Sequence, residues 1–161
     1  MKKLLLAIIF IIMLFGCNKK SNEDTLYGVT ILSKFHYNGF KKSSVSKNYI
    51  SYEKNSLEDF DDMIVEVDKK TNRVVDIRVI KRNVYDLYDE GKKTLKKLEN
   101  KYGRFICERS SAGLMSEIKC ISKKSYNNSH FYLILISNPS GIGGFQNGLV
   151  EELAHSSYKE E

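Results

Sequence analysis

The short motifs of common catalytic sites are missing from this sequence. None of its three histidines lies in an HExxH pattern, and no serine occupies the centre of GxSxG. The glycine-rich stretch 138–144 has neither the Gly-Lys-Ser/Thr ending of a P-loop nor the GxGxxG spacing of a dinucleotide site, so we expect a loop there. No nucleophile or general base can therefore be named. We expect a non-enzymatic protein, with a hydrolase whose active site assembles from distant residues as the alternative.

Cysteine and proline are scarce as well, with three cysteines and one proline. No CxxC pair and no ordered set of histidines accompanies the cysteines, so we expect no metal centre and no cofactor. No repeat and no second linker interrupts the chain after its first polar stretch. One globular domain over residues 26–161 is the simplest interpretation.

A single long apolar run stands at the start of the chain. Lys2 and Lys3 precede the apolar residues 4–15, a run shorter than the about 20 residues that a membrane-spanning helix needs. A positive tip followed by a short apolar run is typical of an export signal, which is removed from the mature protein.

The end of this run, Leu14-Phe15-Gly16-Cys17, resembles the lipobox of bacterial lipoproteins, although Phe15 is bulkier than the residue usual there. The resemblance covers residues 1–17. It implies that residues 1–16 are a signal peptide that is cut off before Cys17. It also implies that the Cys17 thiol receives a diacylglyceryl group and that the new amine is acylated, as by palmitate. Residues 17–25 would then form a lipidated tether.

The residue after the cysteine bears on which membrane holds the anchor. In lipoproteins of double-membrane bacteria, an aspartate at this place tends to retain the protein at the inner membrane, and Asn18 stands here. The resemblance thus implies a cell-envelope protein on the outer membrane facing the periplasm, with the inner membrane as the alternative. A signal without lipidation and a short buried helix are the other interpretations of this segment.

No strong excess of one charge remains once the signal is removed. Without Lys2 and Lys3, 24 of the 26 basic side chains stand against 20 acidic ones. The lysines are spread among acids along the chain, whereas a phosphate-binding protein concentrates them in a stripe. We therefore expect no nucleic-acid partner.

Residues 34–52 place aromatic rings among lysines with no sustained period. Such interleaving is typical of interaction surfaces, and an amphipathic strand with one solvated face would give the same pattern. We predict that this segment contacts a partner, either another envelope protein or an anionic glycolipid. The predicted contact residues are Phe35, Tyr37, Phe40, Lys41 and Lys42.

Residues 63–80 predict a β-hairpin, because two β-branched runs flank a polar turn. We expect residues 70–72 to form the loop, with Asn72 in the left-handed conformation. One face of the hairpin then becomes wholly apolar. Its facing pairs are Met63 with Val79, Val65 with Ile77, and Val67 with Val75.

The opposite face of this hairpin places two carboxylates together. Glu66 lies across from Asp76, and Arg78 lies close by. Two facing carboxylates can share a proton or hold a hard cation. A perturbed pKa needs burial or a cleft, however, so we expect a solvated pair without a functional role.

Apolar residues at helical spacing predict one long helix between Asn83, which can cap its start, and Gly103, which can end it. Apolar runs at 104–109, 114–123 and 130–136 predict strands, and the last run is apolar throughout, so both of its faces should be covered. The predicted fold class is α+β, a small antiparallel sheet with one main helix packed on it. A short helix is expected near the end, with a stripe made of Phe145, Leu149, Val150 and Leu153.

Two cysteines, Cys107 and Cys120, remain after Cys17 is lipidated. An even number of thiols in an exported chain favours a disulfide, and both lie on the core side of neighbouring predicted strands. A tight turn at Ala112-Gly113 would place Cys107 opposite Ile118, so a wider loop or a bulge is needed. Free buried thiols are the alternative.

These observations predict a lipid-anchored bacterial envelope protein that acts by binding or assembly with another envelope component. Two alternatives stay open. One is a periplasmic hydrolase with a dispersed active site, and the other is a phage or plasmid exclusion lipoprotein that blocks a surface receptor. The residues do not separate the exclusion lipoprotein from the first prediction.

The variant Cys17→Ser tests the anchor. We expect it to lose its lipid label, because the thiol that accepts the diacylglyceryl group is gone and acyl chains supply the membrane affinity, about 0.8 kcal/mol for each buried CH₂. Metabolic labelling with a tagged fatty acid measures the outcome. Full retention of labelled lipid in this variant would show that the anchor lies elsewhere.

Overall fold

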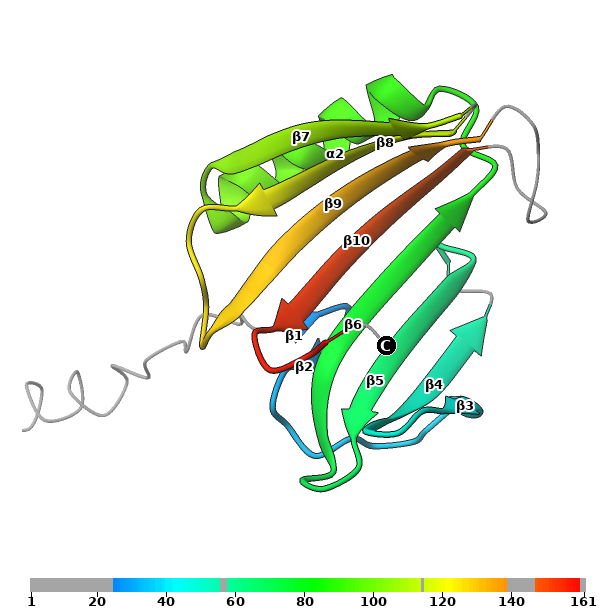
Figure 1. Ribbon diagram of the computed structural model, residues 1–161, viewed down its shortest axis with the longest axis vertical. Helices are drawn as coiled ribbons and strands as arrows, with labels where there is room; N and C mark the ends of the chain where they lie inside the picture. Colours follow the sequence, from blue (N-terminus) through cyan, green and yellow to red (C-terminus); the bar gives the residue numbers. More distant parts are fainter. Residues whose placement is uncertain (1–24, 56–57, 114, 139–146, 160–161) are drawn as a thin grey trace, which may run out of the picture.

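An eight-stranded antiparallel sheet dominates the computed structural model, which describes residues 25–55, 58–113, 115–138 and 147–159 (Figure 1). The strand order is β3-β4-β5-β6-β10-β9-β8-β7, and the hairpin β1–β2 and the helix α2 complete the described elements. None of the described helical segments is both long and apolar enough to cross a membrane. The bounds are β1 Thr25–Leu26, β2 Val29–Thr30, β3 Lys41–Val45, β4 Tyr49–Asn55, β5 Asp62–Asp68, β6 Arg73–Arg82, α2 Leu87–Tyr102, β7 Phe105–Ala112, β8 Met115–Ser122, β9 Ser129–Ser137 and β10 Asn147–His155.

This architecture corrects the predicted fold class, because the protein is mostly β with one large sheet and not α+β with a small one. The main difference is β10, which the sequence predicts as a helix. The apolar residues Leu149, Val150 and Leu153 fit either element by their spacing. The strand forms because β9 and β6 offer backbone partners on both of its sides. Phe145 and most of the predicted loop 138–144 lie outside the described residues.

The sheet is built from two four-stranded meanders, β3 to β6 and β7 to β10 (Figure 1). β6 lies in the middle of the sheet and β7 at its far edge, so the connection between them must cross β10, β9 and β8. α2 is that connection, and it packs on β9 and β10. One face of the sheet is covered as a result.

α2 begins later than the sequence predicts. Its N-cap is Asp86, whose side chain accepts a hydrogen bond from the Asp89 backbone N–H at 3.2 Å. Asn83, the predicted cap, lies before the helix with a positive φ of 53°. The predicted end is confirmed, because Gly103 follows the last turn with a φ of 79°.

The buried stripe of α2 approaches β9 closely. The Tyr102 ring stacks on the Phe131 ring, with centroids 3.6 Å apart. A Cβ atom built at Gly91 would lie 2.6 Å from Leu135 Cδ1, which is closer than real Cβ contacts come. Gly91 therefore allows the helix backbone to sit directly on the sheet.

The two faces of the sheet differ in what covers them. On the first, here called the covered face, α2, the β1–β2 hairpin and residues 31–40 enclose the core. On the second, here called the open face, no described helix or strand packs (Figure 1). The C-terminal turn reaches one end of the open face, where the Arg78 guanidinium lies 3.3 Å from the Tyr158 hydroxyl.

β9 shows this difference within one strand. On the covered face its side chains are at most 7 % exposed, namely Phe131, Leu133 and Leu135. On the open face its apolar side chains are half-buried, namely Tyr132, Ile134 and Ile136. The prediction that both faces of this apolar run are covered is therefore wrong among the residues that the structure describes.

The predicted hairpin is β5–β6, and its facing pairs Met63 with Val79 and Val65 with Ile77 are confirmed. Val67 pairs with Val74 and not with Val75, because the register shifts by one residue near the turn. Asn72 has the predicted left-handed conformation, with a φ of 54°. The loop between the strands is longer than predicted, since it runs from 69 to 72.

A disulfide joins Cys107 and Cys120, as predicted, and ties the edge strand β7 to β8. The two cysteines face each other directly because Ala112 belongs to the strand and pairs with Met115. The turn therefore lies one residue later than Ala112-Gly113. This register brings the cysteines together without a bulge.

The variant Gly91→Ala tests the close approach of α2 to β9. The added methyl raises helix propensity by about 1 kcal/mol, but overpacking a filled core typically costs about 1–3 kcal/mol. We expect a net loss of about 1 kcal/mol in the free energy of unfolding, measured by chemical denaturation. Asn100→Ala, at an exposed position of the same helix, is the control, and its free energy of unfolding should not fall. Equal stability of the two variants would mean that Leu135 has room to move aside.

Candidate functional site

One row of side chains crosses all eight strands on the open face. Directly opposed residues of antiparallel strands point to the same side, so the register itself places these side chains together. Apolar residues occupy the β7–β9 part of the row, and charged residues occupy its middle. From β7 to β3 the row reads Ile106, Ile121, Tyr132, Glu152, Arg78, Ile64, Glu53 and Lys41.

Two neighbouring rows extend the apolar part of the open face. The first contains Glu108, Lys119, Ile134, Val150, Ile80, Asp62 and Asn55. The second contains Ser110, Glu117, Ile136, Gly148 and Arg82. We call the central apolar side chains of these three rows the apolar band: Ile80, Ile121, Tyr132, Ile134, Ile136 and Val150.

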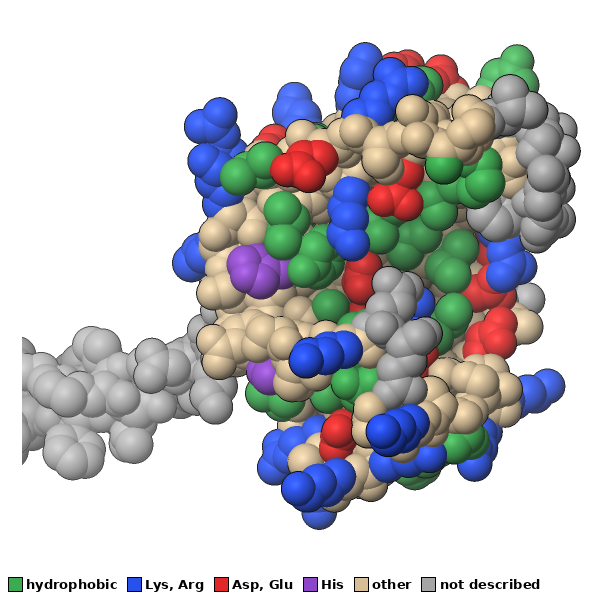
Figure 2. Space-filling model, in the orientation of Figure 1, with side chains coloured by type: hydrophobic (Ala, Val, Ile, Leu, Met, Phe, Trp, Pro, Cys, Tyr) green, Lys and Arg blue, Asp and Glu red, His purple; other side chains and the backbone are tan. Residues whose placement is uncertain are grey.

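The apolar band is accessible from solvent. All of its members except Val150 are half-buried, and Ile106 beside it is 47 % exposed. Figure 2 shows hydrophobic side chains on this face over β9 and β10, with acidic and basic side chains among them. An apolar surface that no described element covers is a candidate binding surface.

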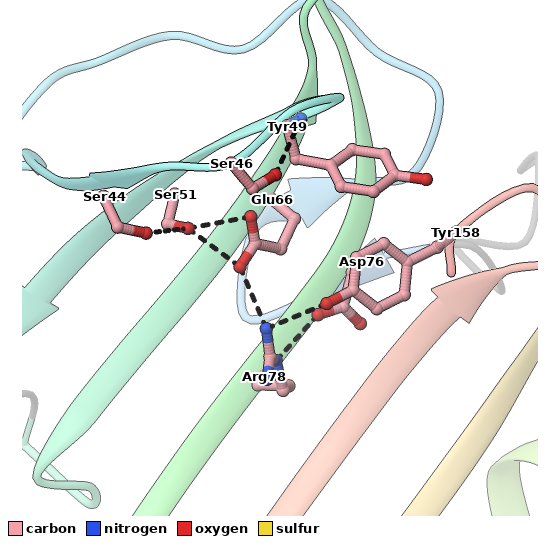
Figure 3. Close-up of polar contacts among 8 residues, drawn as sticks. All are labelled: Ser44, Ser46, Tyr49, Ser51, Glu66, Asp76, Arg78 and Tyr158. Atoms are coloured by element: carbon pink, nitrogen blue, oxygen red, sulfur yellow. Dashed lines mark hydrogen bonds and ion pairs between the residues drawn. The ribbon is translucent and has the colours of Figure 1, made fainter. Parts of the chain in front are cut away.

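A fourth row of the open face is polar and begins at β3. The Ser44 hydroxyl donates a hydrogen bond to Ser51 Oγ at 2.7 Å (Figure 3). The Ser51 hydroxyl lies 2.9 and 3.0 Å from the two carboxylate oxygens of Glu66. Three strands are thereby connected through side chains.

Arg78 continues this chain on β6 (Figure 3). Its Nη2 donates to Glu66 Oε1 at 3.0 Å, and its Nε lies 2.8 Å from Asp76 Oδ2. One guanidinium thus bridges two carboxyl groups. The Tyr158 ring, from the C-terminal turn, lies against the same guanidinium and also against the Tyr49 ring, with the two ring centroids 5.1 Å apart.

The Glu66–Asp76 pair is not solvated, so that prediction is wrong. Asp76 is fully buried and Glu66 is 8 % exposed. The facing arrangement itself is confirmed, since the two residues are register partners. Burial follows because β4 and β10 flank the pair and the Tyr49 and Tyr158 rings lie over its end of the sheet.

Burial raises the pKa of the Asp76 carboxyl well above its usual range, and the neighbouring Glu152 carboxylate raises it further. Arg78 acts in the opposite direction and does not outweigh them. A protonated Asp76 can donate a hydrogen bond to Glu152, its neighbour on β10. Glu66, Asp76, Arg78 and Glu152 therefore form a connected polar cluster on the open face, in which burial and Glu152 favour the uncharged form of Asp76.

The structure divides the predicted partner-contact residues between core and surface. Phe35 is 5 % exposed and packs edge-on against Tyr37 and Phe40, with ring centroids 5.1 Å away in each case. Tyr37 is 46 % exposed, and Lys41 and Lys42 are exposed on the edge strand β3. The rings therefore form a small extension of the core, from which Tyr37 and the two lysines reach solvent.

A hollow of about 500 Å³ lies beside this aromatic extension on the covered side, with walls formed in part by Phe40, Phe60 and Met63. At its edge the Tyr27 hydroxyl donates to the Glu151 carboxylate at 3.2 Å. Burial raises the pKa of the Glu151 carboxyl, while this hydrogen bond lowers it. The hollow is large enough for a small ligand, and its lining names no chemical class.

His130 and His155 lie on neighbouring strands one register position apart, so their side chains point to opposite faces of the sheet. His130 on β9 is within 3.0 Å of the Ser122 carbonyl, and His155 bonds Ser157 at the C-terminal turn. Among the described residues, no group of three or more His, Cys, Asp or Glu side chains is arranged to hold a metal ion. Cys17, the predicted lipidation site, lies outside the described residues.

The open face is the feature that the sequence analysis missed. Its signal was present in β9, whose open-face residues Tyr132, Ile134 and Ile136 are as apolar as those of the core. An apolar run of this kind indicates either a strand covered on both faces or a strand with one binding face. The residues of β10 could not contribute to the prediction while β10 was assigned to a helix.

The variant Asp76→Asn tests the buried proton. A carboxyl whose pKa is raised by folding destabilises the fold increasingly as the pH rises above its unfolded pKa, about 3.9. The free energy of unfolding of Asp76→Asn relative to the wild type should therefore rise between about pH 4.5 and pH 8, measured by denaturant titration.

Asp68→Asn is the matched control. The hydrogen bond from the Thr71 side chain lowers the pKa of Asp68, so its titration lies below this pH range. The difference between that variant and the wild type should stay constant from pH 4.5 to 8. A constant difference for Asp76→Asn as well would mean that Asp76 is ionised in the fold.

Comparisons with family models, curated proteins and solved structures gave no match for this chain. No activity, ligand or partner is therefore transferred from a relative. The function is inferred from the residues and from the geometry of the open face.

Proposed function

We propose that this protein is a lipid-anchored protein of the bacterial envelope that binds another envelope protein through the open face of its sheet. The observation that carries this proposal is the apolar band, which stays half exposed although its strands lie in the middle of the sheet. The hydrophobic effect favours burial of such a surface by about 25 cal/mol per Å². A binding partner would supply the cover that the described chain lacks.

The charge of the open face favours a protein partner over an anionic glycolipid. Its four rows hold four basic groups and seven carboxyl groups, of which Asp76 has a raised pKa that favours its uncharged form, although the whole chain carries a net charge of +6. An acidic surface repels an anionic head group and attracts a basic one. The acids are Glu53, Asp62, Glu66, Asp76, Glu108, Glu117 and Glu152, and the bases are Lys41, Arg78, Arg82 and Lys119.

The partner surface that fits this face is apolar in its middle and basic at its rim. The apolar band would form the centre of the contact, and Glu108, Glu117 and Glu152 would lie around it. An exclusion lipoprotein that blocks a receptor would be one case of such binding. A hydrolase that uses the Asp76–Glu152 pair is less favoured, because Asp76 is fully buried and out of reach of a substrate.

Photo-cross-linking in intact cells tests the open face. A photoreactive amino acid at Ile121 should give a discrete cross-linked product, and the same group at Tyr85, which is fully exposed before α2, should not. Ile134→Lys should lower the yield of the cross-linked product from Ile121. The new lysine places a positive charge in the apolar centre of the contact, opposite a partner that is itself basic. Tyr88→Lys, on the exposed side of α2, is the control and should leave it unchanged.

Two outcomes would contradict the proposal. Equal products from Ile121 and Tyr85 would indicate random encounter. A product from Tyr37 but none from Ile121 would place the contact on the segment that the sequence analysis predicted, residues 34–52.

A further inference from the structure

The exposed side of α2 is rich in lysine. Lys92 and Lys96 lie one turn apart, as do Lys93 and Lys97, and all four are exposed. Side chains at these spacings lie on the same side of a helix, so the four ammonium groups point away from the sheet together. The acids of the first turn, Asp89 and Glu90, lie one turn before Lys92 and Lys93, so the lysines farther along the helix carry most of the excess charge.

More basic residues continue this surface beyond the C-terminal end of α2. The Lys123 backbone N–H donates to the Arg104 carbonyl at 2.9 Å, which holds the β8–β9 connection beside the end of the helix. The Tyr126 hydroxyl donates to the Tyr102 carbonyl at 3.0 Å and fixes the same contact. We call the whole surface the basic face: Lys92, Lys93, Lys96, Lys97, Lys101, Arg104, Lys123 and Lys124.

The basic face is not neutralised within the part of the chain that the structure describes. The ion pairs found there involve Arg78, Lys81 and Arg82, and none of the residues of the basic face. Three acids lie near these eight basic groups: Glu99 is exposed among them, Glu90 interacts with Lys93, and Glu151 interacts with Lys97 and Lys101. In Figure 2, Lys and Arg side chains stand out along the edge of the molecule beyond β7 and β8, where Figure 1 places α2.

The basic face lies on the same side of the sheet as the start of the domain. β1 packs against β10 on the covered face, as α2 does. Tyr27, just after β1, and Lys97 line one hollow of about 230 Å³. Cys17 precedes Thr25 by eight residues, a length of chain that spans at most about 28 Å.

We propose that the basic face lies on the anionic phospholipid head groups of the membrane that holds Cys17. This inference rests on the lipid anchoring put forward under the proposed function. The acyl chains hold the protein to the bilayer, and the basic face sets its orientation. The open face, on the other side of the sheet, is then turned away from the bilayer and toward a partner.

The physical basis is charge complementarity at short range. Basic residues near an anionic membrane surface are attracted individually, and the attraction decays over a Debye length of about 10 Å at 0.1 M salt. The tether keeps the domain near the bilayer at all times, so the basic face acts at high effective concentration. The acidic open face would be repelled by the same surface.

Lysine footprinting of the mature lipoprotein in vesicles tests the orientation. An amine-acylating reagent and mass spectrometry report the labelling rate of each lysine, in phosphatidylcholine vesicles with or without phosphatidylglycerol. Labelling of Lys92, Lys93, Lys96 and Lys97 should fall by about fivefold when the anionic lipid is present, and recover at high salt. Lys70 in the β5–β6 loop and Lys119 on the open face should be labelled equally in both.

A four-lysine variant supplies the matched control. Replacement of Lys92, Lys93, Lys96 and Lys97 by glutamine should abolish the lipid-dependent protection of Lys101. The same replacement at four exposed lysines elsewhere, Lys34, Lys41, Lys42 and Lys70, changes the charge equally and should leave the protection intact. Labelling of the basic face that does not depend on anionic lipid would overturn the proposal.

Vesicle flotation separates this inference from the anchor. A lipidated protein floats with neutral vesicles whether or not the basic face binds lipid. In that case the lysine labelling rates decide whether the basic face contacts the membrane. Flotation with anionic vesicles only, and only at low salt, would support membrane binding by the basic face and contradict the lipid anchor. A protein that floats with neither neutral nor anionic vesicles would contradict both the lipid anchor and the membrane contact of the basic face.

Discussion

The pairing of β10 with β6 is the constraint on which the rest of this structure depends. Register partners run from Gly148 with Arg82 to Ala154 with Asp76, and they join the two meanders into one sheet. Without this pairing, both meanders would present an additional open edge, which proteins avoid. Because β10 takes the place beside β6, β7 must start at the far edge of the sheet. The crossing of α2 over one face is a direct consequence.

That crossing determines the difference between the two faces. The helix packs on β9 and β10, and Gly91 lets it come close enough to bury Leu135 and Phe131. The same chain has no second helix among its described residues to place on the opposite face. The apolar side chains of β9 and β10 that point there are left half exposed, which is why this face is the candidate binding surface.

The open face also tolerates a charged cluster that a closed core would exclude. Burying ionised groups is costly unless they are paired, and Arg78 pairs with both Glu66 and Asp76. Burial and the Glu152 carboxylate also raise the pKa of the Asp76 carboxyl, which favours its uncharged form. Polar groups are thus held in fixed positions beside an apolar surface, which is the composition of many specific interfaces. In the proposed arrangement, the basic face and the tether lie toward the membrane and this surface toward the partner.

The sequence by itself determined the features that depend on residues close together in the chain. The β5–β6 hairpin, the left-handed Asn72, the end of α2 at Gly103 and the Cys107–Cys120 bridge were predicted from local spacing and are present. Only the tertiary structure decided that β10 is a strand, that Glu66 and Asp76 are buried, and that one face of β9 stays open. These features depend on which distant segment supplies the neighbouring strand or the covering helix. A spacing pattern reports which side chains share a face, but it does not report what lies above that face.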